Sequence, residues 1–145
     1  MKSYNLIPQE RNNYCICSVL QAIFNNNKIN LSQKEIADNL TPSDKGFLPH
    51  DDTIKNFLRS RGFEYFFYWY NETPFNEPDE LLRDMNKYEG IIGIKSHIYL
   101  LKNFNDPILE IINPENNKVF RKDIYETLKE MKKLEGFFGL VKILQ

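Results

Sequence analysis

The sequence predicts an α+β fold, with helices in the front half of the chain and β-strands in the back half. Apolar residues up to position 62 recur at helical spacing, in segments bounded by capping residues. From position 63 onward, short apolar and aromatic runs separated by turn residues indicate strands. The length of 145 residues fits one domain, 1–145, built around a single hydrophobic core.

The first two helices are predicted from their boundaries as much as from their apolar faces. Residues 15–26 (CICSVLQAIFNN) start at a cysteine and carry a mostly buried apolar face, and the asparagines at 25–27 end the helix. Ser32 followed by Glu35 is a capping box, because each side chain can satisfy a free backbone N–H at the helix start. A short helix over about 33–40 is therefore expected.

A loop and a third helix complete the front half. Proline and glycine interrupt residues 41–51 and predict a loop. Asp51 or Asp52 can cap the helix that follows, and Gly62 suits its C-terminal cap. The aromatic run 63–70 (FEYFFYWY) then predicts a strand buried between helix and sheet.

The back half is expected to form an antiparallel sheet. Asn105-Asp106-Pro107 is a suitable hairpin connection between the apolar runs on either side of it. The residues after Asn113 (NPENNK) predict another turn. The expected elements are a helix from about 78 to 87, strands at 90–95, 97–104 and 108–114, a helix beginning near Asp123, and a final strand at 136–144.

Composition excludes several classes of function. A net charge of −1 and a pI near 6.1 give no electrostatic reason to expect a nucleic-acid partner. No apolar run approaches the roughly 18 residues that cross a bilayer, and no signal peptide is visible, so neither a membrane partner nor secretion is expected. No metal-ligand cluster or glycine-rich phosphate loop is present, so no cofactor is expected. The lysine-, asparagine- and isoleucine-rich usage suggests an AT-rich microbial genome, and a bacterial protein is expected. Cys15 and Cys17, two residues apart, do not make a disulfide framework, so a cytoplasmic location with reduced thiols is expected.

Three residues can form a catalytic set of a nucleophile, a base and a residue that orients the base. Cys15 starts a helix, where the helix dipole is expected to lower the pKa of its thiol. If strands 97–104 and 108–114 pair antiparallel, His97 at the start of one lies beside Asn113 at the end of the other. A cysteine, a histidine that takes its proton and an asparagine that orients the imidazole form a catalytic set. Gln9, six residues before Cys15, can donate to an oxyanion together with the backbone N–H of Cys15.

This order of residues resembles the papain-like cysteine peptidases. It is most similar to the compact C39-like group, the bacteriocin-leader peptidases, in the spacing of Gln9 to Cys15, the late His97 and the Asn113-Pro114 pair. The resemblance spans almost the whole chain and implies a papain-like α+β fold, with the cysteine helix packed on a small antiparallel sheet. It implies that Cys15 is the nucleophile, His97 the general base and acid, Asn113 the orienting residue and Gln9 the oxyanion donor.

The chain departs from that group at three positions. Ile16 follows the cysteine where the group has glycine, and Ser96 precedes His97 where the group has glycine. Asn113 replaces the common aspartate, so the residue can orient the imidazole but carries no charge. These departures concern the specificity of the group for a pair of small residues before the cut, and they leave the predicted fold unchanged.

Each of these residues also has a structural interpretation. Buried cysteines and turn asparagines are common, and Cys17 is expected to be a core residue and His50 a solvated loop residue. Three functions remain open. The first is a cysteine hydrolase that cleaves a peptide or amide bond through a thioester. The second is an acyltransferase that passes an acyl group to an amine or thiol, and the third is a non-catalytic binding module. A peptide or acyl donor is the expected partner.

Overall fold

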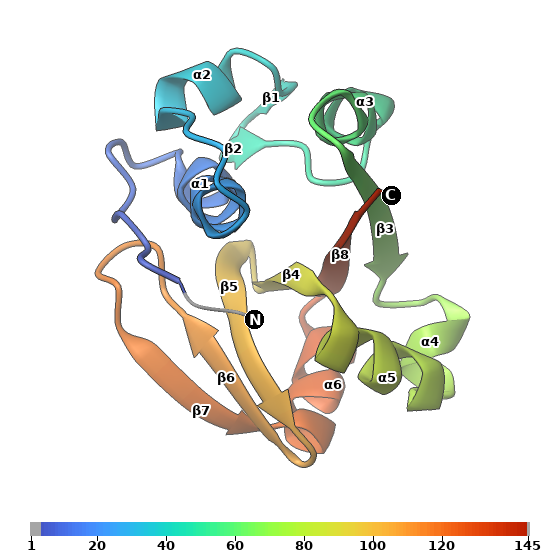
Figure 1. The fold of residues 1–145 in the computed structure, drawn as a ribbon. Helices are drawn as coiled ribbons and strands as arrows, with labels where there is room; N and C mark the ends of the chain where they lie inside the picture. The colour runs from blue at the N-terminus through green and yellow to red at the C-terminus, as the bar shows by residue number, and fades with distance from the viewer. Residues whose placement is uncertain (1–3, 145) are drawn as a thin grey trace.

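The computed structural model describes residues 4–144 and has the predicted α+β architecture. A six-stranded antiparallel sheet runs through its centre, with the strand order β3-β8-β4-β5-β6-β7 (Figure 1). The helices are α1 (Cys15–Asn26), α2 (Gln33–Ala37), α3 (Asp52–Ser60), α4 (Thr73–Asn76), α5 (Asp79–Lys87) and α6 (Ile124–Lys133). The strands are β1 (Pro42–Ser43), β2 (Gly46–Phe47), β3 (Phe63–Trp69), β4 (Glu89–Ile94), β5 (His97–Asn105), β6 (Ile108–Ile112), β7 (Val119–Asp123) and β8 (Phe137–Ile143).

Helices cover both faces of this sheet (Figure 1). The apolar sides of α1, α2 and α3 pack on one face, against alternate residues of β3, β4, β5 and β8. The apolar sides of α5 and α6 pack with Phe75 of α4 on the other face. Among the described residues, no helix combines the length and apolar character needed to cross a bilayer.

The predicted caps of the front helices are present. Ser32 and Glu35 form the capping box of α2, in which the Ser32 hydroxyl accepts from the backbone N–H of Glu35 at 3.0 Å. Asp51, rather than Asp52, caps α3 by accepting from the backbone N–H of Ile54 at 3.3 Å. Gly62 follows the end of α3 with φ +92°, a left-handed conformation that glycine adopts without strain.

Three predicted features differ in the structure. β7 forms between the predicted turn at 113–118 and the helix predicted to begin near Asp123, where no strand was expected. The sequence does not indicate this strand, because its side chains are mostly exposed and show no apolar alternation. The short pair β1 and β2 lies within the predicted loop, and α4 lies within the predicted turn after β3. β3 is an edge strand that pairs only with β8, so it is less buried than its aromatic composition indicates.

Two tight connections bring the predicted site residues to one end of the sheet. Lys95 and Ser96 both have left-handed φ values, +51° and +63°, and reverse the chain between β4 and β5, which places His97 at the start of β5. β5 then pairs antiparallel with β6, with Leu100 opposite Ile112. Asn113, the residue after β6, consequently lies beside the start of β5.

Candidate active site

Cys15 is the first residue of α1 and its side chain is half-buried. The preceding residue, Tyr14, makes no side-chain cap, so the backbone N–H groups of the first turn remain available. Backbone N–H groups of Cys15, Ile16 and Ile98 lie close enough to the thiol to favour its thiolate form. The contact with Ile98 places the start of β5, one residue from His97, against the sulfur.

The predicted lowering of the Cys15 pKa is wrong. Burial of the thiol raises its pKa above the ordinary value, and this effect outweighs the three backbone N–H groups. The carboxylate of Glu115 raises the pKa further, since a nearby negative charge disfavours a thiolate. The resting residue is therefore a thiol that needs a base to remove its proton.

His97 and Asn113 are hydrogen-bonded side chain to side chain. His97 Nε2 lies 2.9 Å from Asn113 Oδ1, and Asn113 itself is buried, with 9% of its surface exposed. The same oxygen accepts the backbone N–H of Glu115 at 3.0 Å. The imidazole is further held by the ring of Tyr99, edge-on, with centroids 4.6 Å apart.

These contacts determine the tautomer of His97. The Asn113 atom that faces His97 also accepts the backbone N–H of Glu115, which identifies it as the amide oxygen. An amide oxygen carries no hydrogen, so it cannot donate to His97. Nε2 of His97 must then carry the proton of the shared hydrogen bond. In the neutral ring, Nδ1 is left with a free lone pair that can accept a proton from a thiol. Asn113 thus has the geometry of an orienting residue.

Gln9 lies beside this pair, although its side chain is turned elsewhere. Its backbone N–H donates to Pro114 O at 2.8 Å, which ties the segment before α1 to the loop after β6. Its side-chain Nε2 donates to Arg11 O and Asn12 O, both at 3.1 Å. The buried Oε1 has no hydrogen-bond partner among the described residues. The amide would have to turn to reach an oxyanion, and its predicted role stays a prediction.

Glu115 is the residue of this site that the sequence analysis missed. Its Oε1 lies 3.8 Å from His97 Nδ1, the nitrogen opposite the Asn113 contact. The only signal in the sequence is its position two residues after Asn113, within a turn where an acidic residue is ordinary.

The other cysteine and the other histidine lie outside the site, as expected from the sequence. Cys17 is fully buried in the core. His50 is exposed in the loop before α3, where its ring lies 5.5 Å from that of Phe67 and 5.9 Å from that of Trp69.

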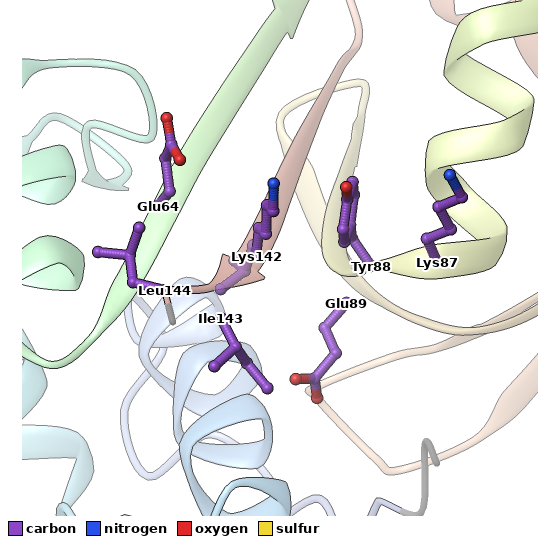
Figure 2. A pocket seen from close by; sticks show the side chains of 8 residues that line it. Glu64, Lys87, Tyr88, Glu89, Lys142, Ile143 and Leu144 are labelled. Carbon is purple, nitrogen blue, oxygen red and sulfur yellow. The ribbon is translucent and has the colours of Figure 1, made fainter.

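A separate hollow of about 490 Å³ lies between the C-terminal ends of α5 and β8 (Figure 2). Figure 2 shows the Glu89 carboxylate pointing away from Lys87 and Lys142. That carboxylate instead accepts from Asn26 and Asn27, at the end of α1 opposite Cys15. The hollow is therefore remote from Cys15 and His97.

Comparison with known proteins supports the fold. No protein-family model matches the chain, and no curated protein matches it. A double glycine motif protease from an AMS/PCAT transporter, solved in complex with the leader peptide, has a TM-score of 0.70 at 16% identity, over 98% of this chain and 93% of that one. The peptidase domain of Streptococcus ComA, a bifunctional ABC transporter of a quorum-sensing pathway, has a TM-score of 0.70 at 19% identity, over 99% of this chain and 100% of that one.

A third structure agrees with the first two. The peptidase domain of Streptococcus mutans ComA, bound to a small-molecule inhibitor, has a TM-score of 0.53 at 18% identity, over 96% of this chain and 99% of that one. At these identities the likeness concerns the fold. The predicted papain-like α+β fold, as found in C39 peptidase domains, is confirmed.

Proposed function

We propose that this protein is a cysteine hydrolase that cleaves a peptide or amide bond with a Cys15–His97–Asn113 triad. The observation that supports this most strongly is the pair of hydrogen bonds to Asn113 Oδ1, from His97 and from the backbone of Glu115. They orient the imidazole and leave Nδ1 free as a base. The backbone N–H of Ile98, the residue that follows His97, acts on the Cys15 thiol, so the nucleophile lies at the start of the same strand. The likeness in fold to peptidase domains adds support.

The reaction follows the chemistry of a thiol and its base. Nδ1 of His97 takes the proton of Cys15 as the sulfur attacks the substrate carbonyl carbon, which forms a C–S bond and an oxyanion. Collapse of this intermediate breaks the C–N bond, and the imidazolium returns its proton to the leaving amine. Water then attacks the thioester with His97 again as base, which releases the acid and restores the thiol.

The raised pKa of Cys15 favours proton transfer during attack over a thiolate formed beforehand. The backbone N–H of Cys15 is one donor for the oxyanion. Gln9 is the second, provided that its amide leaves the carbonyl oxygens of Arg11 and Asn12 when substrate binds. Those two carbonyls belong to the exposed turn before α1, where water can replace the amide as donor.

The substrate class that we propose is a peptide. One structural neighbour, a double glycine motif protease, was solved in complex with the leader peptide, and the likeness in fold supports a peptide as the substrate here. We expect the reaction to take place in the bacterial cytoplasm, where thiols stay reduced.

Incubation with a library of peptides tests this proposal, with new termini identified by mass spectrometry. We expect cleavage by the wild-type protein and by Cys17→Ala, which removes the core thiol only. Cys15→Ala and His97→Ala should produce no new termini, since each removes one partner of the proton transfer. Cleavage by Cys15→Ala at the wild-type rate would contradict the proposal.

A further inference from the structure

The carboxylate of Glu115 lies next to His97, the base of the proposed site. Its Oε1 is 3.8 Å from His97 Nδ1, the atom that receives the thiol proton in the proposed reaction. Its charge also acts on the Cys15 thiol and on the hydroxyl of Tyr99. Glu115 therefore faces the nucleophile, the base and the aromatic ring that holds the base.

The backbone of Glu115 is fixed relative to the triad. Its N–H donates to Asn113 Oδ1 at 3.0 Å, and the preceding carbonyl, that of Pro114, accepts from Gln9 at 2.8 Å. The N–H of Asn117 closes the turn onto Asn113 O at 2.8 Å. The turn that positions Asn113 consequently also positions the backbone of Glu115 beside the site.

The side chain itself is open to a ligand. It is 57% exposed, and within the part of the chain that the structure describes His97 is the one basic group that reaches it within 4.0 Å. The contact of 3.8 Å with His97 is too long to hold the carboxylate firmly, and a cationic group can replace it.

We propose that Glu115 is a specificity-determining residue that binds a cationic group of the substrate, a lysine or arginine side chain or a free amine, beside the scissile bond. This inference rests on the proposed function, because it concerns the substrate of that site.

The effect of Glu115 on the Cys15 thiol agrees with this assignment. An unneutralised carboxylate disfavours the thiolate of Cys15, so it slows the nucleophile when no cation is present. A bound ammonium or guanidinium group cancels that charge and leaves the three backbone N–H groups to stabilise the developing thiolate. Cationic substrates are therefore expected to be both bound and attacked more readily than neutral or acidic ones.

Charged thiol reagents test the assignment without knowledge of the natural substrate. The rates of Cys15 modification are measured at low ionic strength with three methanethiosulfonates, the cationic 2-trimethylammonioethyl, the neutral methyl and the anionic 2-sulfonatoethyl reagent. Each rate is normalised to that of free glutathione, and modification is assigned to Cys15 by peptide mass spectrometry. Cys17 is fully buried and does not compete.

The ratio of cationic to anionic rates is the decisive quantity. A unit charge about 6 Å away changes a rate about threefold in water, so Glu115→Gln should lower the ratio about tenfold, and Glu115→Lys should lower it further. Glu126→Gln, an equally simple change at an exposed glutamate on α6, should leave the ratio at the wild-type value. Equal ratios in the wild-type protein and Glu115→Gln would overturn the inference.

The same reagents separate this inference from the proposed function. His97→Ala is measured with the neutral reagent, which the charge of Glu115 neither attracts nor repels. An unchanged rate in His97→Ala would contradict the proposed function and the inference with it. A strongly reduced rate in His97→Ala together with equal charge ratios would contradict the role of Glu115 alone.

Discussion

The amide oxygen of Asn113 links the base to the backbone of the turn that follows β6. It accepts from His97 Nε2 at 2.9 Å and from the Glu115 N–H at 3.0 Å. Two donors saturate the lone pairs of one carbonyl oxygen, so the amide is held in a single orientation. An uncharged residue can therefore orient the imidazole here by geometry alone.

Replacement of Asn113 by aspartate and by alanine tests whether the acceptor oxygen of its side chain orients the imidazole. Asn113→Asp keeps an acceptor for both donors, and we expect it to retain activity. Asn113→Ala leaves the imidazole free to rotate and should reduce the rate of peptide cleavage about 10²-fold or more, the range typical of a misplaced general base. Circular dichroism checks that both variants are folded. Equal activity in Asn113→Ala and the wild-type protein would rule out the orienting role.

The buried thiol of Cys17 makes the free energy of unfolding depend on pH in the alkaline range. Burial raises the pKa of its thiol from 9.0 to about 12, so between these values the unfolded chain has released a proton that the folded chain still holds. The free energy of unfolding should therefore fall as pH rises through this range. Urea titrations of Cys17→Ala should give a shallower decline than the wild-type protein, and parallel declines would contradict the assignment. The half-buried Tyr4 and the buried Tyr65 contribute equally to both proteins.

The sequence predicts the proximity of His97 and Asn113, because this proximity depends only on the pairing of two strands that are neighbours in the chain. Antiparallel pairing of two runs across a short turn is enough to place His97 beside Asn113. The contact of Glu115 with His97 and the orientation of the Gln9 amide depend on side-chain rotamers and on a loop conformation. Neither leaves a periodic or compositional signal in the chain.

At the scale of elements, a buried glutamine holds the segment before α1 in place. Gln33 on α2 is fully buried, and its Nε2 donates to Ile7 O, Pro8 O and the side chain of Gln21 on α1. Its Oε1 accepts the backbone N–H of Glu10 at 2.9 Å. The chain on both sides of Gln9 is thereby attached to α1 and α2.

Loss of this side chain should affect stability and the site together. Gln33→Leu leaves the backbone N–H of Glu10 and the amide oxygen of Gln21 without their partner, at a cost of about 2–4 kcal/mol in the free energy of unfolding. The neighbouring exposed Lys34→Ala, which breaks only a surface ion pair with Asp38, should cost less than about 1 kcal/mol. Chemical denaturation measures both, and similar losses in the two variants would contradict the role of Gln33.

Elements at the edges of the sheet were the hardest to predict from sequence. β7 has exposed side chains along most of its length, so it lacks the alternation that marks half-buried strands. β3 has the composition of a central strand yet lies at the opposite edge, because pairing order depends on contacts between distant segments. The N-terminal caps of α2 and α3 were predicted correctly, since capping is decided by neighbours in the sequence, whereas the short helix α4 was missed.

At the scale of the whole molecule, α1 is anchored at both ends to opposite ends of the sheet. Its first residue contacts the start of β5 at the site, and its last turn is bound to the first residue of β4. That residue, Glu89, is 7% exposed and accepts from Tyr4, Asn26 and Asn27 at 2.6–2.8 Å. Twelve residues of helix separate the two ends, which corresponds to about 18 Å.

This separation predicts an effect on stability without an effect on reactivity. Glu89→Gln replaces one acceptor oxygen by a donor amide that faces other donors, and it should lower the free energy of unfolding by about 1–3 kcal/mol. The rate of Cys15 modification in the folded protein should stay at the wild-type value. Glu64→Gln is the matched control, because Glu64 lines the same hollow between α5 and β8 as Glu89 (Figure 2). It should change neither the free energy of unfolding nor the rate of Cys15 modification. A slowed reaction at Cys15 in Glu89→Gln would show that the far end of α1 influences the site.

The central claim, that Cys15 and His97 act as nucleophile and base, is tested most directly by alkylation with iodoacetamide at neutral pH. Peptide mass spectrometry reads Cys15 and Cys17 separately in the wild-type protein and in His97→Ala. Because burial keeps Cys15 protonated, the account predicts that its labelling slows at least about tenfold without His97, while Cys17 stays unlabelled in both folded proteins. Equal labelling of Cys15 in the two proteins would contradict it.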